Sequence, residues 1–325
     1  MKIIMTQSVC KEGLEIMEKH GINYQDANGN NPNDYLDLMK DADGIVVRIA
    51  TCDANVIENS PNLKVIGRTG VGYDYVDVKK ATEKGIPVVI TPGANNRSVA
   101  EHTVATILAM SKNLYESENE FRKGNWSIRG NGKIIEFENK IVGIIGMGNI
   151  GKIVCELCNG LGMHVLGFDT FFTKSQIEEM GAEYCDDKDE LLRRSDFVTV
   201  HIPLFETTRN TIAKRELEIM KETSFLINTS RGGIVNEEDL ADALNNGEIA
   251  GASLDVYSQE PLDRDHPLFS APNLMMTPHT AAQSKEAVIK MAEMCVNGMI
   301  AVLNGKKWPH VADKKVYNHP RWKEK

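Results

Sequence analysis

Short apolar runs rich in β-branched residues alternate with amphipathic segments along the whole chain. Such runs are typical of buried strands, and the segments between them have helical spacing. This alternation predicts parallel sheets covered by helices, an α/β fold. The predicted strands are 2–5, 44–48, 64–67, 87–90, 141–146, 164–168, 197–201, 224–228, 250–255 and 274–276. They are too many for one simple doubly wound sheet and indicate two such domains.

Two long helical segments indicate how the domains connect. One helix is predicted from Ser98 to Leu114, with Ser98 and Glu101 at the spacing of a capping box, and another from Lys285 to Leu303. If the second helix packs on the N-terminal strands, the first domain is discontinuous. We therefore expect one domain formed by two stretches and a second domain inserted between them. The expected bounds are 1–97 with 285–325 for the first domain and 98–284 for the second.

A glycine-rich turn follows the first predicted strand of the inserted domain and leads into a helical run. It contains Gly146, Gly148, Asn149, Ile150 and Gly151. Here the first glycine permits a tight turn, the second lets a pyrophosphate approach the backbone, and the third lets helix and strand pack closely. The helix N-terminus adds amide groups and a positive dipole for the anion. The turn therefore predicts a dinucleotide site.

An aspartate supports the same interpretation. Asp169 ends the next predicted strand, about 20 residues after the third glycine. A carboxylate there can accept hydrogen bonds from an adenosine ribose and repel a 2′-phosphate, so NAD is favoured over NADP. Lys174 could offset part of that repulsion.

Three later strands end in polar residues. Arg231 follows the predicted strand 224–228, Asp255 ends the strand 250–255 and is followed by Glu260, and His279 follows the strand 274–276. Ligands of open α/β sheets meet the carboxyl ends of the strands. An arginine, a glutamate and a histidine are therefore expected to converge on one cleft.

Composition excludes several function classes. The 325 residues carry a net charge of −9, which disfavours a general role on nucleic acid or an anionic membrane. No apolar stretch reaches the roughly 20 residues of a membrane span, and the N-terminal apolar run is too short for a secretion signal. Six scattered cysteines have no paired metal-ligand spacing and suit a reducing compartment. We expect a cytoplasmic protein without a metal site, and a loosely held polar end, 312–325.

These motifs, in this order, resemble those of the D-isomer-specific 2-hydroxyacid dehydrogenases over nearly the whole chain. The segments that carry the resemblance are GMGNIG at 146–151, NTSRGGIVNEEDL at 228–240, DVYSQEP at 255–261 and TPHT at 277–280. The segments 63–77 and 91–103 are most similar to the 3-phosphoglycerate dehydrogenases of that family. The resemblance implies an NAD-binding Rossmann domain inserted into a discontinuous, flavodoxin-like substrate domain.

The resemblance also implies catalytic roles that suit the chemistry of the side chains. His279 would take the hydroxyl proton as hydride leaves carbon 2, and Glu260 would hold the other ring nitrogen. Arg231 would bind the substrate carboxylate with its planar fork. Asp255 would accept from the nicotinamide carboxamide. Further cofactor contacts are implied at His201, Pro203, Thr208 and Thr229.

Arginines at two strand ends of the first domain suggest a second anion site. Arg48 and Arg68 would suit a phosphate, with Arg129 a weaker candidate, although ordinary surface salt bridging is the alternative. The resemblance implies that the amides around Val71 and Gly72 bind the substrate carboxylate and that Asn95 contacts the same ligand. The chain departs from the family pattern at Tyr75 and Ala281, and both residues can reshape the pocket.

The expected activity is hydride transfer between NAD and a D-2-hydroxyacid, first of all 3-phosphoglycerate. A hydroxypyruvate, glyoxylate or other 2-oxoacid reductase is the alternative enzyme. An NAD-sensing binding protein similar to the related corepressors is the alternative of another class. The segment 116–135 and the helix from Ser98 resemble the family's dimerisation region, which predicts a homodimer.

Overall fold

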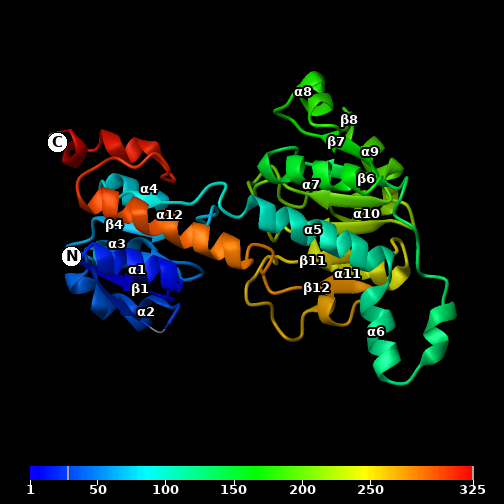
Figure 1. Cartoon of the computed structure of the whole chain (residues 1–325), viewed down its shortest axis with the longest axis horizontal. Helices are drawn as coiled ribbons and strands as arrows, with labels where there is room; N and C mark the ends of the chain where they lie inside the picture. Colours follow the sequence, from blue (N-terminus) through cyan, green and yellow to red (C-terminus); the bar gives the residue numbers. More distant parts are fainter. Residues whose placement is uncertain (28, 324–325) are drawn as a thin grey trace. The chain divides into compact units, whose positions relative to one another are not determined.

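A computed structural model describes residues 1–27 and 29–323 of the chain (Figure 1). It divides into two compact units, Met1–Asn95 with Gln283–Lys325 and Asn96–Ala282. The boundaries predicted from the sequence are 97/98 and 284/285. The first unit is discontinuous along the chain, because the second is inserted between its two stretches.

The first unit is built on a five-stranded parallel sheet in the order β2-β1-β3-β4-β5. This is the strand order of flavodoxin-like folds. The strands are β1 (Lys2–Met5), β2 (Asn23–Asp26), β3 (Gly44–Val47), β4 (Val65–Arg68) and β5 (Val88–Val89). The helices are α1 (Lys11–Lys19), α2 (Pro32–Tyr35), η1 (Leu36–Asp41), α3 (Ala54–Glu58), α4 (Val78–Glu83), α12 (Lys285–Leu303), η4 (Lys314–Asn318) and η5 (Pro320–Trp322).

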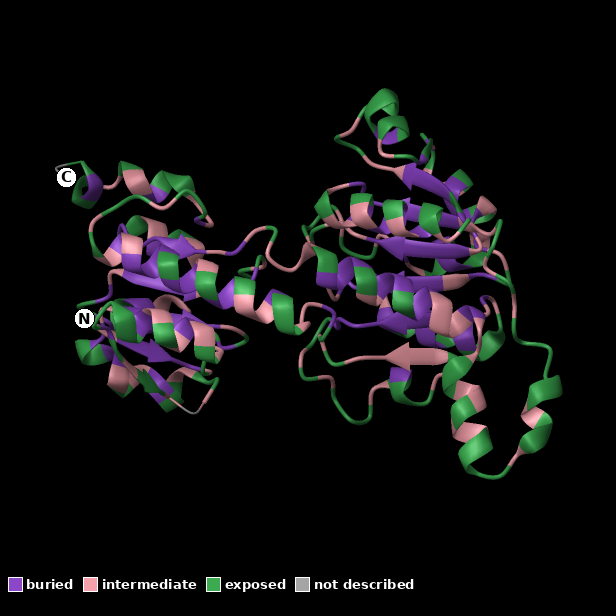
Figure 2. Cartoon of the chain, viewed as in Figure 1, coloured by how far each residue is buried: buried purple, intermediate pink, exposed green. Residues whose placement is uncertain are grey.

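Alternate residues of β1, β3, β4 and β5 enter two different cores. On β1, Ile4 packs with Met39 and Val56, whereas Ile3 and Met5 pack with residues of α1 and α12 such as Met299. Because the side chains of a strand point alternately to its two faces, both faces of the sheet are covered by helices. Figure 2 shows the inner strands of the sheets buried and the helices buried along one side only.

The second unit is built on a seven-stranded parallel sheet in the order β12-β11-β10-β9-β6-β7-β8. Its strands are β6 (Ile141–Ile145), β7 (His164–Phe168), β8 (Glu183–Tyr184), β9 (Phe197–Val200), β10 (Phe225–Asn228), β11 (Gly251–Leu254) and β12 (Leu274–Met276). Its helices are α5 (Asn96–Ser111), α6 (Leu114–Arg122), η2 (Trp126–Gly130), α7 (Asn149–Gly160), α8 (Lys174–Glu179), α9 (Lys188–Arg194), α10 (Lys214–Ile219), α11 (Glu237–Asn246) and η3 (Pro267–Phe269). The order reverses between β6 and β9, as in dinucleotide-binding folds.

Two cores again enclose this sheet. Ile144 packs with residues of α5 and α7, and Ile145 packs with Leu191, Leu217 and Leu240 from α9, α10 and α11. The predicted architecture of two doubly wound parallel-sheet domains is therefore confirmed. Cys155 and Cys158 are buried and unpaired inside α7, as core cysteines are.

The capping box predicted at Ser98 is wrong. Helix α5 begins at Asn96, so Ser98 lies in its first turn, and the Ser98 hydroxyl donates to the carbonyl oxygen of Ala281 at 2.7 Å. Glu101 pairs with Arg97 one turn away. The serine therefore ties the helix to the loop after β12 instead of capping it.

The expectation of a loosely held polar end is also wrong for the described part of it. Val311 forms an antiparallel bridge with Val89 of β5, and Ala312 N donates to Val88 O at 2.9 Å. Val316 and Trp322 are buried, and the Trp322 indole donates to Gly85 O at 2.9 Å. Two apolar side chains are enough to fix this polar segment to the first unit.

The described part of the chain contains no helix both long and apolar enough to cross a bilayer. Within the same residues, no group of three or more His, Cys, Asp or Glu side chains is arranged to hold a metal ion.

Candidate active site

The candidate site of the second unit lies at the carboxyl ends of its strands. The glycine-rich turn follows β6, Asp169 follows β7, and His201 follows β9. Arg231 follows β10, and the loops after β11 and β12 carry Glu260 and His279. A parallel sheet brings these ends to one edge, on both sides of the point where the strand order reverses.

The three glycines of the turn are required for different reasons. Gly146 has φ of +100°, a conformation that side chains rarely adopt. A Cβ on Gly151 would lie 2.1 Å from the carbonyl oxygen of Gly146, so this glycine lets α7 meet the strand. A Cβ on Gly148 would meet no described atom within 4 Å, so protein packing does not demand glycine there. The open space over Gly148, in front of the N-terminus of α7, fits a pyrophosphate.

Asp169 is held directly beside this turn. Its carboxylate accepts from the backbone N–H of Met147 at 2.8 Å and of Phe171 at 2.7 Å. These bonds fix the carboxylate at the carboxyl end of β7. The position suits a ribose, and the negative charge opposes a 2′-phosphate.

Four more predicted cofactor residues lie at the same edge of the sheet, since His201, Pro203 and Thr208 follow β9 and Thr229 follows β10. Burial lowers the pKa of His201 to about 3, so its ring is neutral, and its Nε2 lies 3.0 Å from the hydroxyl of Thr199. Its Nδ1 is buried without a hydrogen-bond partner among the described residues. The Thr208 hydroxyl donates to Pro203 O at 2.7 Å, and Thr229 bonds the hydroxyl of Thr103 on α5 at 2.8 Å.

Glu260 and His279 form a hydrogen-bonded pair. Glu260 Oε2 lies 2.7 Å from His279 Nδ1, which leaves Nε2 of the ring for a substrate. Burial alone would raise the pKa of Glu260, but the hydrogen bond to His279, the charge of that ring and the charge of Arg231 lower it overall. The glutamate therefore stays ionised in acid where an ordinary glutamate begins to take up a proton.

Arg231 lies close enough to act on this pair. Its charge contributes to the lowered pKa of Glu260, and its Nη1 donates to the carbonyl oxygen of Ser230 at 2.7 Å. The turn that carries it is held by Asn228, whose side chain donates to Arg231 O and accepts from Ser230 N. A guanidinium, an imidazole and a carboxylate are thus brought together by three strand ends.

Asp255 organises the loop that carries His279. It is 1% exposed, and its carboxylate accepts from the N–H groups of Thr280 and Ala281 at 2.7 and 2.9 Å and from the Thr277 hydroxyl at 2.6 Å. Its carbonyl oxygen accepts from His279 N at 2.8 Å. His279 has φ of +53°, which is uncommon for a side-chain-bearing residue, and these bonds hold it there. The buried Tyr257, which sequence reasoning missed, donates to the carbonyl oxygens of Leu254 and Thr277, both at 3.0 Å.

The predicted substrate residues belong to the first unit. Arg48 follows β3 and Arg68 ends β4, and Val47 pairs with Arg68 in the sheet, so both arginines lie at one edge. The Arg68 guanidinium lies over Gly70, where a Cβ would come within 2.0 Å of its Nη1. The next two residues are Val71 and Gly72, and Asn95 is the last residue of this stretch of the unit. Arg129 is exposed on η2 of the other unit.

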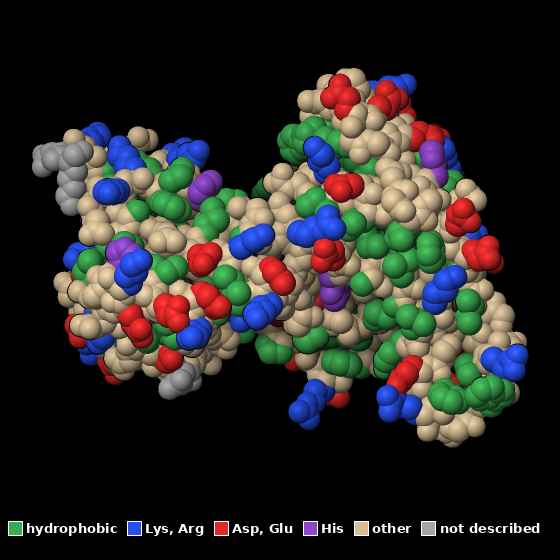
Figure 3. Space-filling view, in the orientation of Figure 1, with side chains coloured by type: hydrophobic (Ala, Val, Ile, Leu, Met, Phe, Trp, Pro, Cys, Tyr) green, Lys and Arg blue, Asp and Glu red, His purple; other side chains and the backbone are tan. Residues whose placement is uncertain are grey.

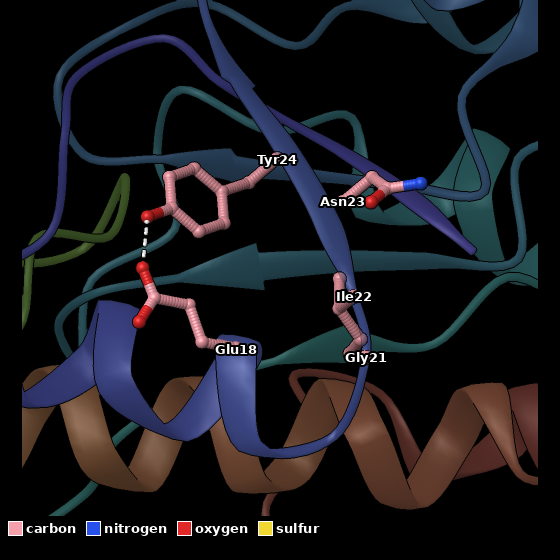
Figure 4. A pocket seen from close by; sticks show the side chains of 5 residues that line it. All are labelled: Glu18, Gly21, Ile22, Asn23 and Tyr24. Atoms are coloured by element: carbon pink, nitrogen blue, oxygen red, sulfur yellow. Dashed lines mark hydrogen bonds between the residues drawn. The ribbon is translucent and has the colours of Figure 1, made fainter.

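A surface hollow in the first unit has a different character (Figure 4). It is lined by residues at the end of α1 and on β2, and the Tyr24 hydroxyl donates to Glu18 Oε1 across it at 2.7 Å. The carboxylate of Glu18 raises the pKa of that phenol. A hollow with this negative charge does not suit an anionic ligand.

The seven-stranded sheet, the glycine turn and Asp169 define a dinucleotide-binding protein with two parallel-sheet domains. The family model described as "D-isomer specific 2-hydroxyacid dehydrogenase, NAD binding domain" matches residues 104–281. The chain belongs to the D-isomer specific 2-hydroxyacid dehydrogenase family, and its second unit is the family's NAD-binding domain.

Proteins similar to the chain carry more than one name. It is 39% identical over 306 residues to a D-3-phosphoglycerate dehydrogenase of Methanocaldococcus jannaschii, covering 94% of this chain and 58% of that protein. It is 34% identical over 321 residues to a glyoxylate reductase of Korarchaeum cryptofilum, covering 97% of this chain and 96% of that protein. The NAD complex of a formate dehydrogenase from Staphylococcus aureus superposes with a TM-score of 0.85 at 30% identity, covering 97% of this chain and 98% of that one. The chain thus spans little more than half the length of the phosphoglycerate dehydrogenase.

Proposed function

We propose that the protein is an NAD-dependent oxidoreductase that moves hydride between NAD and a D-2-hydroxyacid. The 2.7 Å pair of Glu260 and His279 beside Arg231 carries the proposal. Membership of the family and the open space beside Gly148 support it. Bound NAD supplies the hydride acceptor for the oxidation.

The side chains divide the remaining work. Nε2 of His279 takes the hydroxyl proton as the carbon–hydrogen bond breaks, and it returns the proton in the reverse reaction. The Glu260 carboxylate on Nδ1 stabilises the resulting imidazolium. Arg231 binds the substrate carboxylate through two parallel hydrogen bonds and polarises the neighbouring carbonyl group. Asp255 keeps the histidine in its unusual backbone conformation throughout.

We propose 3-phosphoglycerate and 3-phosphohydroxypyruvate as the substrate pair. Arg48 and Arg68 at neighbouring strand ends support a substrate with a second anionic group, and Val71, Gly72 and Asn95 complete the proposed contacts. A glyoxylate or hydroxypyruvate reductase is the second candidate, because a relative that covers nearly the whole chain bears the name glyoxylate reductase.

Comparing phosphorylated with unphosphorylated 2-oxoacids tests this choice. With NADH, we expect kcat/KM for 3-phosphohydroxypyruvate to exceed that for hydroxypyruvate at least tenfold, because the missing phosphate leaves one charge-assisted contact unmade. Initial rates of NADH oxidation give both values. Equal values, or a preference for the unphosphorylated acid, would favour the reductase.

Asp169 should control the choice of cofactor. Replacing Asp169 with Ala removes the charge that opposes a 2′-phosphate, so we expect the ratio of kcat/KM for NADPH to that for NADH to rise about tenfold or more. Asp186→Ala is the matched control, because Asp186 is an exposed aspartate that follows β8, the strand next to β7. A wild-type preference for NADPH, or an unchanged ratio in Asp169→Ala, would contradict the assignment.

We propose that the protein is a cytoplasmic homodimer. Large apolar side chains on and around α6 and η2 stand in solvent: Leu114, Tyr115, Phe121, Trp126 and Ile134 are each more than half exposed. Phe121 and Trp126 contact each other edge to face, and Figure 3 shows apolar side chains gathered at the end of the segment formed by α6 and η2. An exposed apolar cluster of this kind supports burial against a second copy.

The six unpaired cysteines support the cytoplasmic location, because unpaired cysteines suit a reducing compartment.

A further inference from the structure

The turn that carries Arg231 and the loop that carries Glu260 touch each other through their backbones. We call residues 228–233 the arginine turn and residues 255–261 the glutamate loop. A Cβ on Gly232 of the arginine turn would lie 1.9 Å from the carbonyl carbon and oxygen of Tyr257 and 2.4 Å from Ser258 N. Only glycine leaves room for this contact, so the two segments are packed with no side chain between them.

A buried carboxylate fastens the glutamate loop just beyond this contact. Glu237 is 6% exposed, and its two oxygens accept from the backbone N–H of Ser258 at 2.5 Å and from the Ser258 hydroxyl at 2.8 Å. The imidazole Nε2 of His266 lies 3.5 Å from the same carboxylate. Within the described part of the chain, the hydrogen bonds and the ion pair of this carboxylate are thus all directed at the segment that follows β11.

The element that carries Glu237 is a capped helix. Glu237 is the first residue of α11, and the side chain of the preceding residue, Asn236, caps this helix by accepting from Asp239 N at 3.1 Å. A carboxylate in the first turn of a helix also lies at the positive end of the helix dipole. Three residues separate the helix from the arginine turn, so Glu237 links the two catalytic segments.

The contacts continue from Ser258 to the reacting histidine. The residue before Ser258 is Tyr257, whose backbone N–H donates to Oε1 of Glu260 at 3.1 Å. The other oxygen of Glu260 bonds Nδ1 of His279. Displacing Ser258 would therefore displace the donor that orients Glu260, and with it the carboxylate that orients the imidazole.

We infer that Glu237 is a positioning residue of the active site, which through Ser258 and Tyr257 holds Glu260 against His279 and locks the glutamate loop to the arginine turn. The inference rests on the proposed function, because it assigns Glu237 an effect on that reaction. Among the described residues, the hydrogen bonds and ion pair of the Glu237 carboxylate go to Ser258 and His266, so it would act through the glutamate loop and not by contact with the substrate.

Kinetics of Glu237→Ala test this role against a matched control. We expect kcat to fall about 10- to 100-fold while the KM for NADH stays within about threefold, because small displacements of catalytic groups cost about this much. Glu237→Gln keeps one acceptor for Ser258 and should recover part of the loss. Glu238→Ala, an exposed residue of the same helical turn, should match wild type.

A double variant separates positioning from a general loss of structure. In a Glu260→Gln background, the further effect of Glu237→Ala on kcat should shrink to about twofold, because the group that it positions is already impaired. Ser258→Ala removes one of the two bonds and should give a smaller loss of the same kind, which provides a second variant if Glu237→Ala folds poorly. Unchanged kcat in both Glu237→Ala and Ser258→Ala, or a full additional loss in the Glu260→Gln background, would overturn the inference.

Amide hydrogen exchange provides a readout that needs no activity. Exchange across 255–261 should quicken in Glu237→Ala and stay at the wild-type rate in Glu238→Ala. Inactivity of the wild-type enzyme with every 2-oxoacid would contradict the proposed function itself. Wild-type activity together with unchanged kinetics and unchanged exchange in Glu237→Ala would contradict only the role of Glu237.

Discussion

Replacing His279 with Ala is expected to lower kcat by about a thousandfold while the Kd for NADH changes less than threefold. The imidazole is the proposed acid and base at the reacting oxygen, and a positioned proton-transfer group is worth about 10²- to 10⁴-fold. The glycine turn and Asp169, which make the proposed cofactor contacts, are left unchanged. Stopped-flow measurement of hydride transfer and fluorescence titration of NADH give the two quantities.

A second histidine–glutamate pair provides the control. His164 lies 2.7 Å from Glu183, the same separation as in the catalytic pair, but His164 begins β7 and is half exposed. His164→Ala should therefore keep the wild-type kcat. A His279→Ala variant with a rate near wild type would remove His279 from the mechanism.

Replacing Arg231 with Ala should give the other large effect, in a different kinetic parameter. We expect kcat/KM for the 2-oxoacid to fall about 10³-fold, with a large part of the loss in KM, because the substrate carboxylate loses a two-pronged charge-assisted partner. Arg231→Lys should recover little of the loss, since an ammonium cannot make both parallel bonds. Saturation curves at fixed NADH separate kcat from KM.

Arg193→Ala is the matched control for this variant, because Arg193 is an exposed arginine on α9. It should leave both parameters unchanged. If Arg231→Ala bound the 2-oxoacid as tightly as wild type, another cation would have to hold the carboxylate.

The sequence predicts most of the fold because both sheets are parallel and buried on both faces. Strands such as β6 and β9 are continuous apolar runs, which single-sequence patterns reveal well. The predicted helix from Lys285 to Leu303 is confirmed with those bounds. Polar residues directly after such strands must lie at one edge of the sheet, which is why the sequence could suggest that Arg231 and His279 converge.

The strands that the sequence did not reveal are at the edges. β2 is exposed along most of its length and contains no aliphatic residue, and β8 has only two residues. Their strand conformation comes from pairing with β1 and β7, which is tertiary information. The edge position removes the apolar pattern on which prediction depends.

The contacts between loops were equally hidden. The cofactor contact of Asp255 stays a prediction, and the structure adds that its carboxylate accepts from the loop that carries His279, which the sequence did not indicate. From the sequence, Glu237 is an ordinary acidic residue in the first turn of a helix. Its hydrogen bond with Ser258 exists only because the fold brings the two residues together. Such bonds join residues far apart in the chain, so no local pattern marks them.

The most direct test of the account is the configuration of the product. The protein is incubated with NADH and 3-phosphohydroxypyruvate, with glyoxylate, hydroxypyruvate and pyruvate in parallel, and each chiral hydroxyacid formed is assigned by chiral chromatography. We expect NADH oxidation with at least one of these acids, a D-hydroxyacid wherever the product is chiral, and loss of both in His279→Ala. An L-hydroxyacid as product would contradict the account. So would the absence of NADH oxidation with a broader panel of 2-oxoacids despite measurable NADH binding, and that result would favour an NAD-sensing binding protein.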